Sequence, residues 1–112
     1  MSTEVGVVLV TFPDAETAGR MADGLLARRL AACVQTLPIQ SAYHWKGAVH
    51  RDSEVLALIK TQCAMYPEVE ALIRSEHPYE TPEIIMLPIA TGFAGYLDWI
   101  RGETSGNPPT SE

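Results

Sequence analysis

The sequence predicts an α+β fold, a ferredoxin-like βαββαβ sandwich followed by a C-terminal helix. Three observations predict it. The chain has 112 residues, which leaves room for one hydrophobic core. Apolar runs of strand length and stretches with helical spacing follow one another in the order strand, helix, strand, strand, helix, strand. The two middle strands meet at a tight turn, and two βα units around a central hairpin form a split βαβ arrangement.

The first strand is predicted over Val5–Phe12, and the first helix from Asp14 to about Arg29. Val5–Phe12 is a continuous apolar run, which is typical of a strand covered on both faces. Pro13 interrupts this run, and Asp14 is a suitable N-cap for the helix. The apolar residues of the helix recur at the spacing of one buried stripe: Ala18, Met21, Ala22, Leu25 and Leu26.

A long hairpin is predicted next. Its first arm consists of Ala32–Leu37 and Ile39–Trp45, and Pro38 between them indicates either an edge position or a bulge. Lys46 and Gly47 supply the turn, because Gly47 can adopt a positive φ angle. The second arm then returns to the sheet.

The second helix is predicted from Pro67 to near Glu76. Proline suits the first helical position, because the N–H that it lacks would be unpaired there in any case. The helix must end near Glu76, because Pro78 disfavours helical geometry at His77. The apolar residues of its inner face are Val69, Leu72 and Ile73.

The last strand is predicted over Ile84–Ile89, with Pro88 at an edge or outside the hydrogen-bonded ladder. The C-terminal helix has apolar residues at i, i+3, i+4 and i+7: Phe93, Tyr96, Leu97 and Ile100. Gly102 is predicted to end this helix. We therefore expect a single domain over residues 1–102 and a disordered acidic tail over residues 103–112.

One face of the predicted sheet lacks a covering layer. The two main helices cover one face only, yet Val5–Phe12 and the second hairpin arm at Val55–Ile59 look apolar on both faces. The tip of the hairpin, around residues 43–52, also extends beyond so small a sheet. In a one-domain chain the simplest cover for an apolar face is another copy of the chain. The pattern therefore predicts an oligomer.

Composition excludes several classes of protein. The net charge is −6 and the basic residues are scattered, which disfavours a nucleic-acid partner. The apolar run Val5–Val10 is too short to span a bilayer, and Met1–Glu4 lacks the positive charge of a signal peptide. We expect a cytoplasmic protein without a membrane partner. Cys33 and Cys63 are too few for a disulfide framework and fit a reducing compartment.

Several motifs occur together in a characteristic order. They are Leu30-Ala31-Ala32-Cys33, Tyr43-x-Trp45-x-Gly47, Glu54-Val55, Ile59-Lys60-Thr61, His77-Pro78-Tyr79, Pro82 and Tyr96-Leu97-x-Trp99. On these motifs the chain resembles the CutA family, the divalent-cation tolerance proteins, over roughly residues 5–101. The resemblance implies a homotrimer similar to the PII-type signalling proteins, in which the long hairpins pair between subunits. It also implies an association with divalent metals, copper(II) especially. Position 44 departs from the family, which more often has an aromatic residue there than His44.

Five residues are candidate metal ligands: Cys33, His44, His50, Glu54 and His77. Thiolate and imidazole suit copper and zinc, but Cys33 fits a small buried apolar position better than a ligand position. His44 and His50 lie on opposite arms of the hairpin, and the sequence leaves open whether they share a face. His50, Asp52 and Glu54 alternate, so they point the same way in a regular strand. This alternation is also what a solvated hairpin face looks like, and it lacks a tight ligand spacing.

Six further residues are candidates for a ligand cleft or a subunit interface: Tyr43, Trp45, Lys60, Tyr79, Glu80 and Trp99. Two prolines stiffen the turn that holds Tyr79 and Glu80. His77 in this turn either ligates a metal or binds an anion, with Lys60 nearby by analogy with the family. Alternatively, the turn clamps the oligomer, and Tyr79 bonds across the interface. Trp45 and Trp99 are interpreted as packing or interface anchors.

The leading hypothesis is a trimeric divalent-cation tolerance protein that binds copper(II) or another divalent cation and is not an enzyme. Its expected partners are two further copies of itself and metal ions. The alternatives are a PII-like signalling module that senses a small ligand, and a structural scaffold. An enzyme built on Lys60, Glu54 and His77 is disfavoured, because the sequence has no nucleophile–base set, phosphate loop or cofactor motif.

Overall fold

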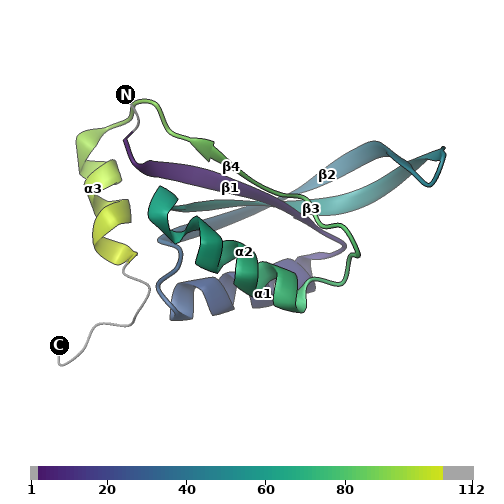
Figure 1. Ribbon diagram of the computed structural model, residues 1–112, viewed down its shortest axis with the longest axis horizontal. Helices are drawn as coiled ribbons and strands as arrows, with labels where there is room; N and C mark the ends of the chain where they lie inside the picture. Colours follow the sequence, from purple (N-terminus) through teal and green to yellow (C-terminus); the bar gives the residue numbers. More distant parts are fainter. Residues whose placement is uncertain (1–2, 105–112) are drawn as a thin grey trace.

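The predicted order of elements is confirmed. A computed structural model describes residues 3–104, and the chain passes through a four-stranded sheet and three helices (Figure 1). A short 3₁₀ turn, η1 (Cys63–Met65), precedes the second helix. The elements are β1 (Val5–Phe12), α1 (Ala15–Ala27), β2 (Cys33–Trp45), β3 (Ala48–Gln62), α2 (Tyr66–Glu76), β4 (Ile84–Pro88) and α3 (Ala94–Glu103).

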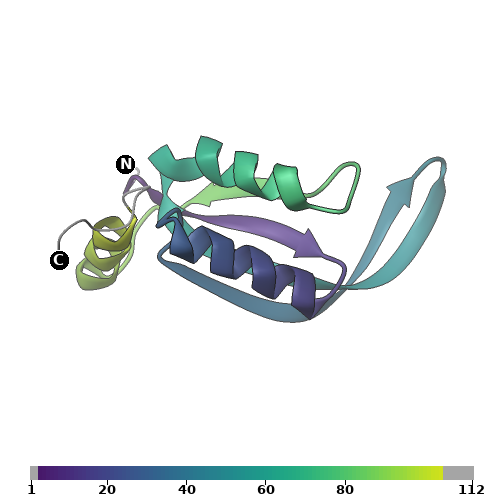
Figure 2. The same cartoon turned by 90° about the horizontal axis from the view of Figure 1, so that it is seen from below.

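The sheet has the strand order β2-β3-β1-β4, and every neighbouring pair is antiparallel. This is the order expected of a split βαβ fold, because the two βα units interleave their strands. Helices α1 and α2 lie side by side over one face of the sheet (Figure 2). The third helix lies at one end of the sheet, and the hairpin of β2 and β3 projects from the other end (Figure 1).

The main core lies between the sheet and the two helices. Alternate residues of β1, namely Val8, Val10 and Phe12, are fully buried on this side, as the period of two in a strand requires. They meet the inner stripes of the helices and the neighbouring strand: Ala18, Met21, Leu25, Ala57, Ile59, Val69, Leu72 and Ile73. A second, smaller cluster joins Leu97 and Ile100 of α3 to Val5.

Helix α1 begins as predicted and ends earlier than predicted. The Asp14 carboxylate accepts a hydrogen bond of 2.8 Å from the Thr17 N–H and caps the first turn. The last helical residue is Ala27, because Arg29 adopts a left-handed conformation with φ of 57°. The Leu30 N–H then bonds to the Leu25 carbonyl at 2.9 Å, which closes a Schellman motif.

The hairpin is longer and more regular than predicted. Pro38 does not divide β2, and it lies opposite Val55 in an unbroken ladder. Because β2 is an edge strand, the backbone N–H that Pro38 lacks leaves no neighbouring group unpaired. The prediction that Pro38 lies at an edge position is therefore confirmed. Lys46 and Gly47 both have positive φ, 52° and 82°, which defines a two-residue type I′ turn.

The outer part of the hairpin has no third strand beside it. Phe12 pairs with Val55 at the end of β1, and beyond this point residues 39–54 pair only with each other. The predicted extension of the hairpin beyond the sheet is therefore confirmed. This projecting part forms one wall of the site described below.

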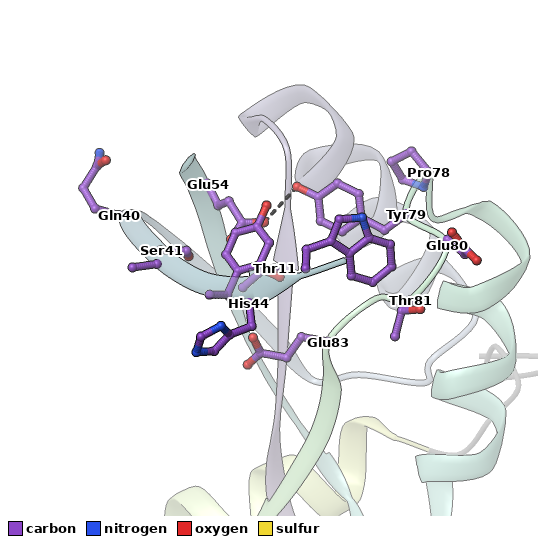
Figure 3. Close-up of a pocket in the computed structure, with 13 residues that line it drawn as sticks. Thr11, Gln40, Ser41, His44, Glu54, Pro78, Tyr79, Glu80, Thr81 and Glu83 are labelled. Atoms are coloured by element: carbon purple, nitrogen blue, oxygen red, sulfur yellow. Dashed lines mark hydrogen bonds between the residues drawn. The ribbon is translucent and has the colours of Figure 1, made fainter. Parts of the chain in front are cut away.

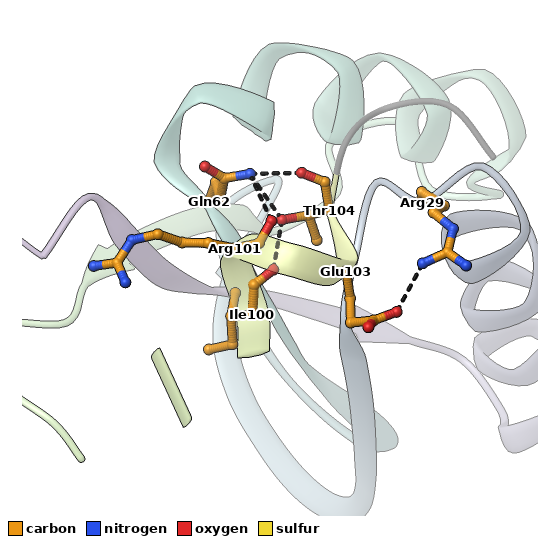
Figure 4. Close-up of polar contacts among 6 residues, drawn as sticks. All are labelled: Arg29, Gln62, Ile100, Arg101, Glu103 and Thr104. Atoms are coloured by element: carbon orange, nitrogen blue, oxygen red, sulfur yellow. Dashed lines mark hydrogen bonds and ion pairs between the residues drawn. The ribbon is translucent and has the colours of Figure 1, made fainter. Parts of the chain in front are cut away.

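The predicted end of the last helix at Gly102 is wrong. Helix α3 continues to Glu103, and Thr104 after it is 1% exposed. Contacts that are distant in sequence hold this end: the Gln62 side-chain N–H₂ donates to the Thr104 hydroxyl at 3.0 Å, and Arg29 pairs with Glu103 at 2.7 Å (Figure 4). The remaining residues of the predicted tail, 105–112, lie outside the described residues.

The face of the sheet opposite α1 and α2 is largely uncovered within the chain. We call it the open face. The strand registers place seven apolar side chains on it: Val7, Leu9, Leu37, Leu56, Leu58, Ile85 and Leu87. Ile85 is 48% exposed and Leu87 is 50% exposed, although both lie inside a strand. Within residues 3–104, no helix is both long and apolar enough to cross a membrane.

Candidate functional site

An open groove of about 930 Å³ lies between the projecting hairpin and the 78–83 segment that joins α2 to β4 (Figure 3). One wall comes from the hairpin and the other from the segment between α2 and β4. The lining contains three carboxylates and three aromatic rings, and it contains no Lys or Arg. The lining residues are Thr11, Gln40, Ser41, Ala42, Tyr43, His44, Trp45, Glu54, Pro78, Tyr79, Glu80, Thr81 and Glu83.

His77 anchors the 78–83 segment to the sheet. Its Nδ1 accepts the Tyr79 N–H at 3.1 Å, so its Nε2 carries the proton and donates to the Thr11 carbonyl at 2.7 Å. The ring also stacks on Phe12, with 4.9 Å between the ring centroids. Both ring nitrogens are thus engaged, and a metal at either one would have to break a hydrogen bond. The geometry gives His77 a positioning role.

Tyr79 joins the two walls of the groove. Its hydroxyl donates a hydrogen bond of 2.8 Å to Glu54 Oε2, next to the last residue pair of β1 and β3 (Figure 3). Burial, and then the bond to the Glu54 carboxylate, raise the pKa of Tyr79 well above its usual value. This bond lies within one chain, and the cross-subunit contact of Tyr79 considered in the sequence analysis stays a prediction.

The hairpin separates its two histidines. In the β2–β3 register His50 lies opposite Tyr43 and His44 lies opposite Val49, so the two imidazoles project from opposite faces. The His50 ring stacks on Tyr43 at 5.8 Å between centroids. The Tyr43 hydroxyl donates to Asp52, and this bond raises the pKa of Tyr43.

The regular register places His50, Asp52 and Glu54 on one face of β3, as the alternation predicted. The two carboxylates accept hydrogen bonds from tyrosines, Asp52 from Tyr43 and Glu54 from Tyr79. Within residues 3–104 of a single chain, no three His, Cys, Asp or Glu side chains lie close enough together to hold a metal ion.

Within one chain Lys60 lies away from His77 and from the groove, so its expected proximity to His77 is wrong. Lys60 pairs with Val7, four residues along β1 from Thr11, whose carbonyl His77 contacts. Lys60 is six residues from Glu54 along β3, which corresponds to roughly 20 Å. Cys33, a free thiol, is its cross-strand partner. Lys60 Nζ donates to Gln35 at 2.5 Å and lies 6.0 Å from the ring of Tyr96. Trp99 stacks on Tyr96 at 5.6 Å, so it belongs to this second cluster at the other end of the sheet.

Several groove residues were missed by the sequence reasoning. Trp45 and Glu80 were expected in a cleft and do line the groove, but Gln40, Thr81 and Glu83 were not considered. Glu83 immediately precedes β4, and the polar residues at strand ends were a usable signal for it. Gln40 had no such signal, because only the projection of the hairpin brings it to the groove.

Comparison with known proteins gives a consistent result. A family model described as CutA1 divalent ion tolerance protein matches residues 6–103. The divalent-cation tolerance protein CutA of Thermus thermophilus is 46% identical over 99 residues, which are 88% of this chain and 96% of that protein. Protein CutA of Homo sapiens is 45% identical over 101 residues, which are 89% of this chain and 56% of that longer protein.

Solved structures agree with the fold. The periplasmic divalent cation tolerance protein CutA from Archaeoglobus fulgidus superimposes with a TM-score of 0.88 at 35% identity, covering 90% of this chain and 99% of that one. The Thermus thermophilus protein superimposes with a TM-score of 0.87 at 44% identity, again covering 90% and 99%.

Proposed function

This chain belongs to the CutA1 divalent ion tolerance family, and from that premise we propose that it binds divalent cations, copper(II) foremost, as a homotrimer that catalyses no reaction. The observation that carries the proposal is the open face. In a fold of packed layers, the apolar side of each layer is normally buried. Here one face of the sheet is uncovered within the chain, and its residues Ile85 and Leu87 are about half exposed. Sister chains supply a cover of matching shape and chemistry.

Assembly also supports metal binding. In a trimer every hairpin imidazole is present three times, so one His per chain would supply three nitrogen ligands where the three hairpins meet. His44 and His50 are exposed on the projecting hairpin, whereas His77 is held by two hydrogen bonds. Imidazole suits copper(II), and the thiol of half-buried Cys33 suits the softer copper(I). We therefore rank His44 and His50 above His77 as ligands.

Two measurements test this proposal. Light scattering of the purified protein is expected to give a mass of three times the 12.2 kDa of one chain. Calorimetric titration of tag-free protein with copper(II) is expected to show saturable binding that His44→Ala or His50→Ala weakens. The variant His77→Ala, compared at equal folded fraction, is expected to retain it. A single-chain mass, or a flat titration at micromolar copper, would overturn the corresponding part.

The groove favours a second candidate function, a PII-like module that senses a small ligand. Its walls are the projecting hairpin and the 78–83 segment, and Tyr79 links them, so a ligand between the walls would fix the hairpin relative to the sheet. Capture of one defined partner only when ligand is added would support this function. A cytoplasmic location, supported by two free thiols, belongs to the same proposal.

A further inference from the structure

Helix α3 packs on the rest of the chain through a hydrophobic cluster of its own. Leu97 and Ile100 of the helix meet Val5 at the start of β1, and each of the three is at most 6% exposed. The main core lies between the sheet and the helices α1 and α2, and within residues 3–104 it contains no buried residue from α3. Figure 1 shows α3 at the end of the sheet, with α1 and α2 along its face. Loss of the small cluster therefore leaves the main core intact.

A side chain of β3 caps the C-terminal end of α3. The last carbonyl groups of a helix have no partner within it and need donors from elsewhere. Here the Gln62 side-chain amide donates to the Thr104 carbonyl at 2.5 Å and to the Thr104 hydroxyl at 3.0 Å, and it lies 3.5 Å from the Arg101 carbonyl oxygen (Figure 4). The Thr104 hydroxyl in turn donates to the Ile100 carbonyl at 2.7 Å. The bonds from Gln62 exist only while α3 lies against β3.

Two arginines hold the same end of the helix. Arg29 pairs with Glu103 at 2.7 Å, and Arg101 donates to the Thr3 carbonyl at 2.9 Å. The Arg29 and Glu103 side chains are 29% and 43% exposed, so this ion pair alone contributes little to stability. The contacts at the last turn form together, because each of them needs the helix in its docked position.

Helix α3 is too short to persist without these contacts. It has 10 residues, and Gly95 and Gly102 are two of them. Isolated helices shorter than about 12–15 residues are marginal in water, and glycine lowers the stability of a helix further. Undocking and unfolding of α3 are therefore a single event.

We propose that α3 is a latch: it is helical only when docked, Gln62 holds it closed, and it releases without unfolding the main core. Release uncovers Val5, which lies on the same side of β1 as Val7 and Leu9 of the open face. The latch therefore sets how far the apolar surface of the sheet extends toward this end of the molecule. All of its contacts described above lie within one chain, so the latch does not depend on the proposed trimer.

Hydrogen exchange of single amides, measured by NMR on the full chain as purified, tests the latch. The amides of residues 98–103 are expected to share one protection factor, at least about tenfold lower than that of the slowest amides in α1 and α2. A shared value indicates release of the whole helix. Protection that falls steadily toward Glu103 would indicate fraying from the end, and protection equal to that of α1 and α2 would show that α3 opens only with the main core. Either result would overturn the proposal.

Substitutions of Gln62 test its part in holding the latch closed. Gln62→Met keeps the approximate size of the side chain and removes the donor, so it is expected to lower the protection of α3 about fivefold. Gln62→Glu is expected to lower it further, because a negative charge then faces the carbonyl end of the helix dipole. Protection in α1 and α2 is expected to change less than about twofold in both variants.

Gln35→Glu is the matched control. Gln35 lies on β2, on the same face of the sheet, and its side-chain oxygen accepts a bond from Lys60, so a carboxylate there keeps this bond. It is expected to change the protection of α3 less than about twofold.

Two outcomes of the comparison would contradict the latch. An equal loss of protection in α1, α2 and α3 would mean that Gln62 supports the whole fold, and an equal effect of Gln35→Glu would mean that added charge acts without regard to position. If Gln62→Glu does not fold, Gln62→Met provides the comparison. Light scattering of the same samples records the mass, so a single-chain mass can refute the trimer while the latch stands.

Discussion

The hydroxyl of Tyr79 donates a 2.8 Å hydrogen bond to the carboxylate of Glu54, 25 residues away in sequence. Glu54 is the first residue of β3 that lies beyond the end of β1, at the base of the projecting hairpin. The bond therefore connects the segment after α2 to the hairpin where the sheet stops supporting it.

Tyr79→Phe is expected to lower the free energy of unfolding by about 1–2 kcal/mol, because it removes a partly buried hydrogen bond to a charged group. Urea denaturation measures this change. Tyr43→Phe is the matched control, since it removes a fully exposed bond to Asp52 and is expected to cost less. Equal losses in the two variants would contradict a special role for the Tyr79 bond.

Alkaline pH is expected to weaken the same bond. Burial, and then the bond to Glu54, raise the pKa of Tyr79 in the folded chain above its unfolded value of about 10. The stabilisation is therefore complete below about pH 10 and is lost as the pH rises toward the folded pKa. The unfolding free energy of the wild type should fall more steeply between pH 9.5 and 11.5, as a rough window, than that of Tyr79→Phe. Parallel curves for the two proteins would refute this.

His77→Ala is expected to destabilise the chain by about 2–3 kcal/mol. It removes the contact of the ring with Phe12, deprives the Tyr79 N–H of its acceptor and deprives the Thr11 carbonyl of its donor. His44→Ala, at an exposed hairpin position, is expected to change stability by less than about 0.5 kcal/mol. Thermal and urea unfolding measure both, and a stable His77→Ala protein would show that the anchor is dispensable.

Gly6→Ala and Gly19→Ala are expected to have opposite effects. A Cβ at Gly6 would lie 2.6 Å from the Leu87 carbonyl oxygen, a backbone atom of β4 that cannot move aside, so a loss of about 1–3 kcal/mol is expected. A Cβ at Gly19, inside α1, would meet nothing within 4 Å, and alanine there should add about 0.5–1 kcal/mol. Urea denaturation of both variants measures these changes in the free energy of unfolding. An unchanged free energy of unfolding in Gly6→Ala would mean that β4 can shift.

Leu87→Lys is expected to break the proposed trimer while leaving the single chain folded. Leu87 lies on the open face and is 50% exposed, so lysine there is tolerated in a monomer and leaves a charge buried in an interface. Leu26→Lys is the matched control, because Leu26 on α1 is 43% exposed on the opposite side of the molecule. Light scattering compares the masses. A trimeric Leu87→Lys would exclude the open face from the interface.

Local chemistry explains what was predictable. Pro78 sets the end of α2 at Glu76, and a strand's period of two already divides Val5–Phe12 between two faces. A two-residue turn at Lys46 and Gly47 likewise needs only its neighbours. Each of these features depends on residues a few positions apart, so the sequence by itself determined the element order, the long hairpin and the apolar open face.

Contacts between residues that are distant in sequence decided the features that local spacing did not predict. His77 meets the Thr11 carbonyl 66 residues away, Gln62 holds the end of α3 at Thr104, and Lys60 lies far from the groove because of its place on β3. Register and helix docking set these distances, and neither is encoded in the local spacing of residues. The fold class follows from periodicity within each segment, whereas the groove and its charges exist only once the hairpin and the segment after α2 are packed on one sheet.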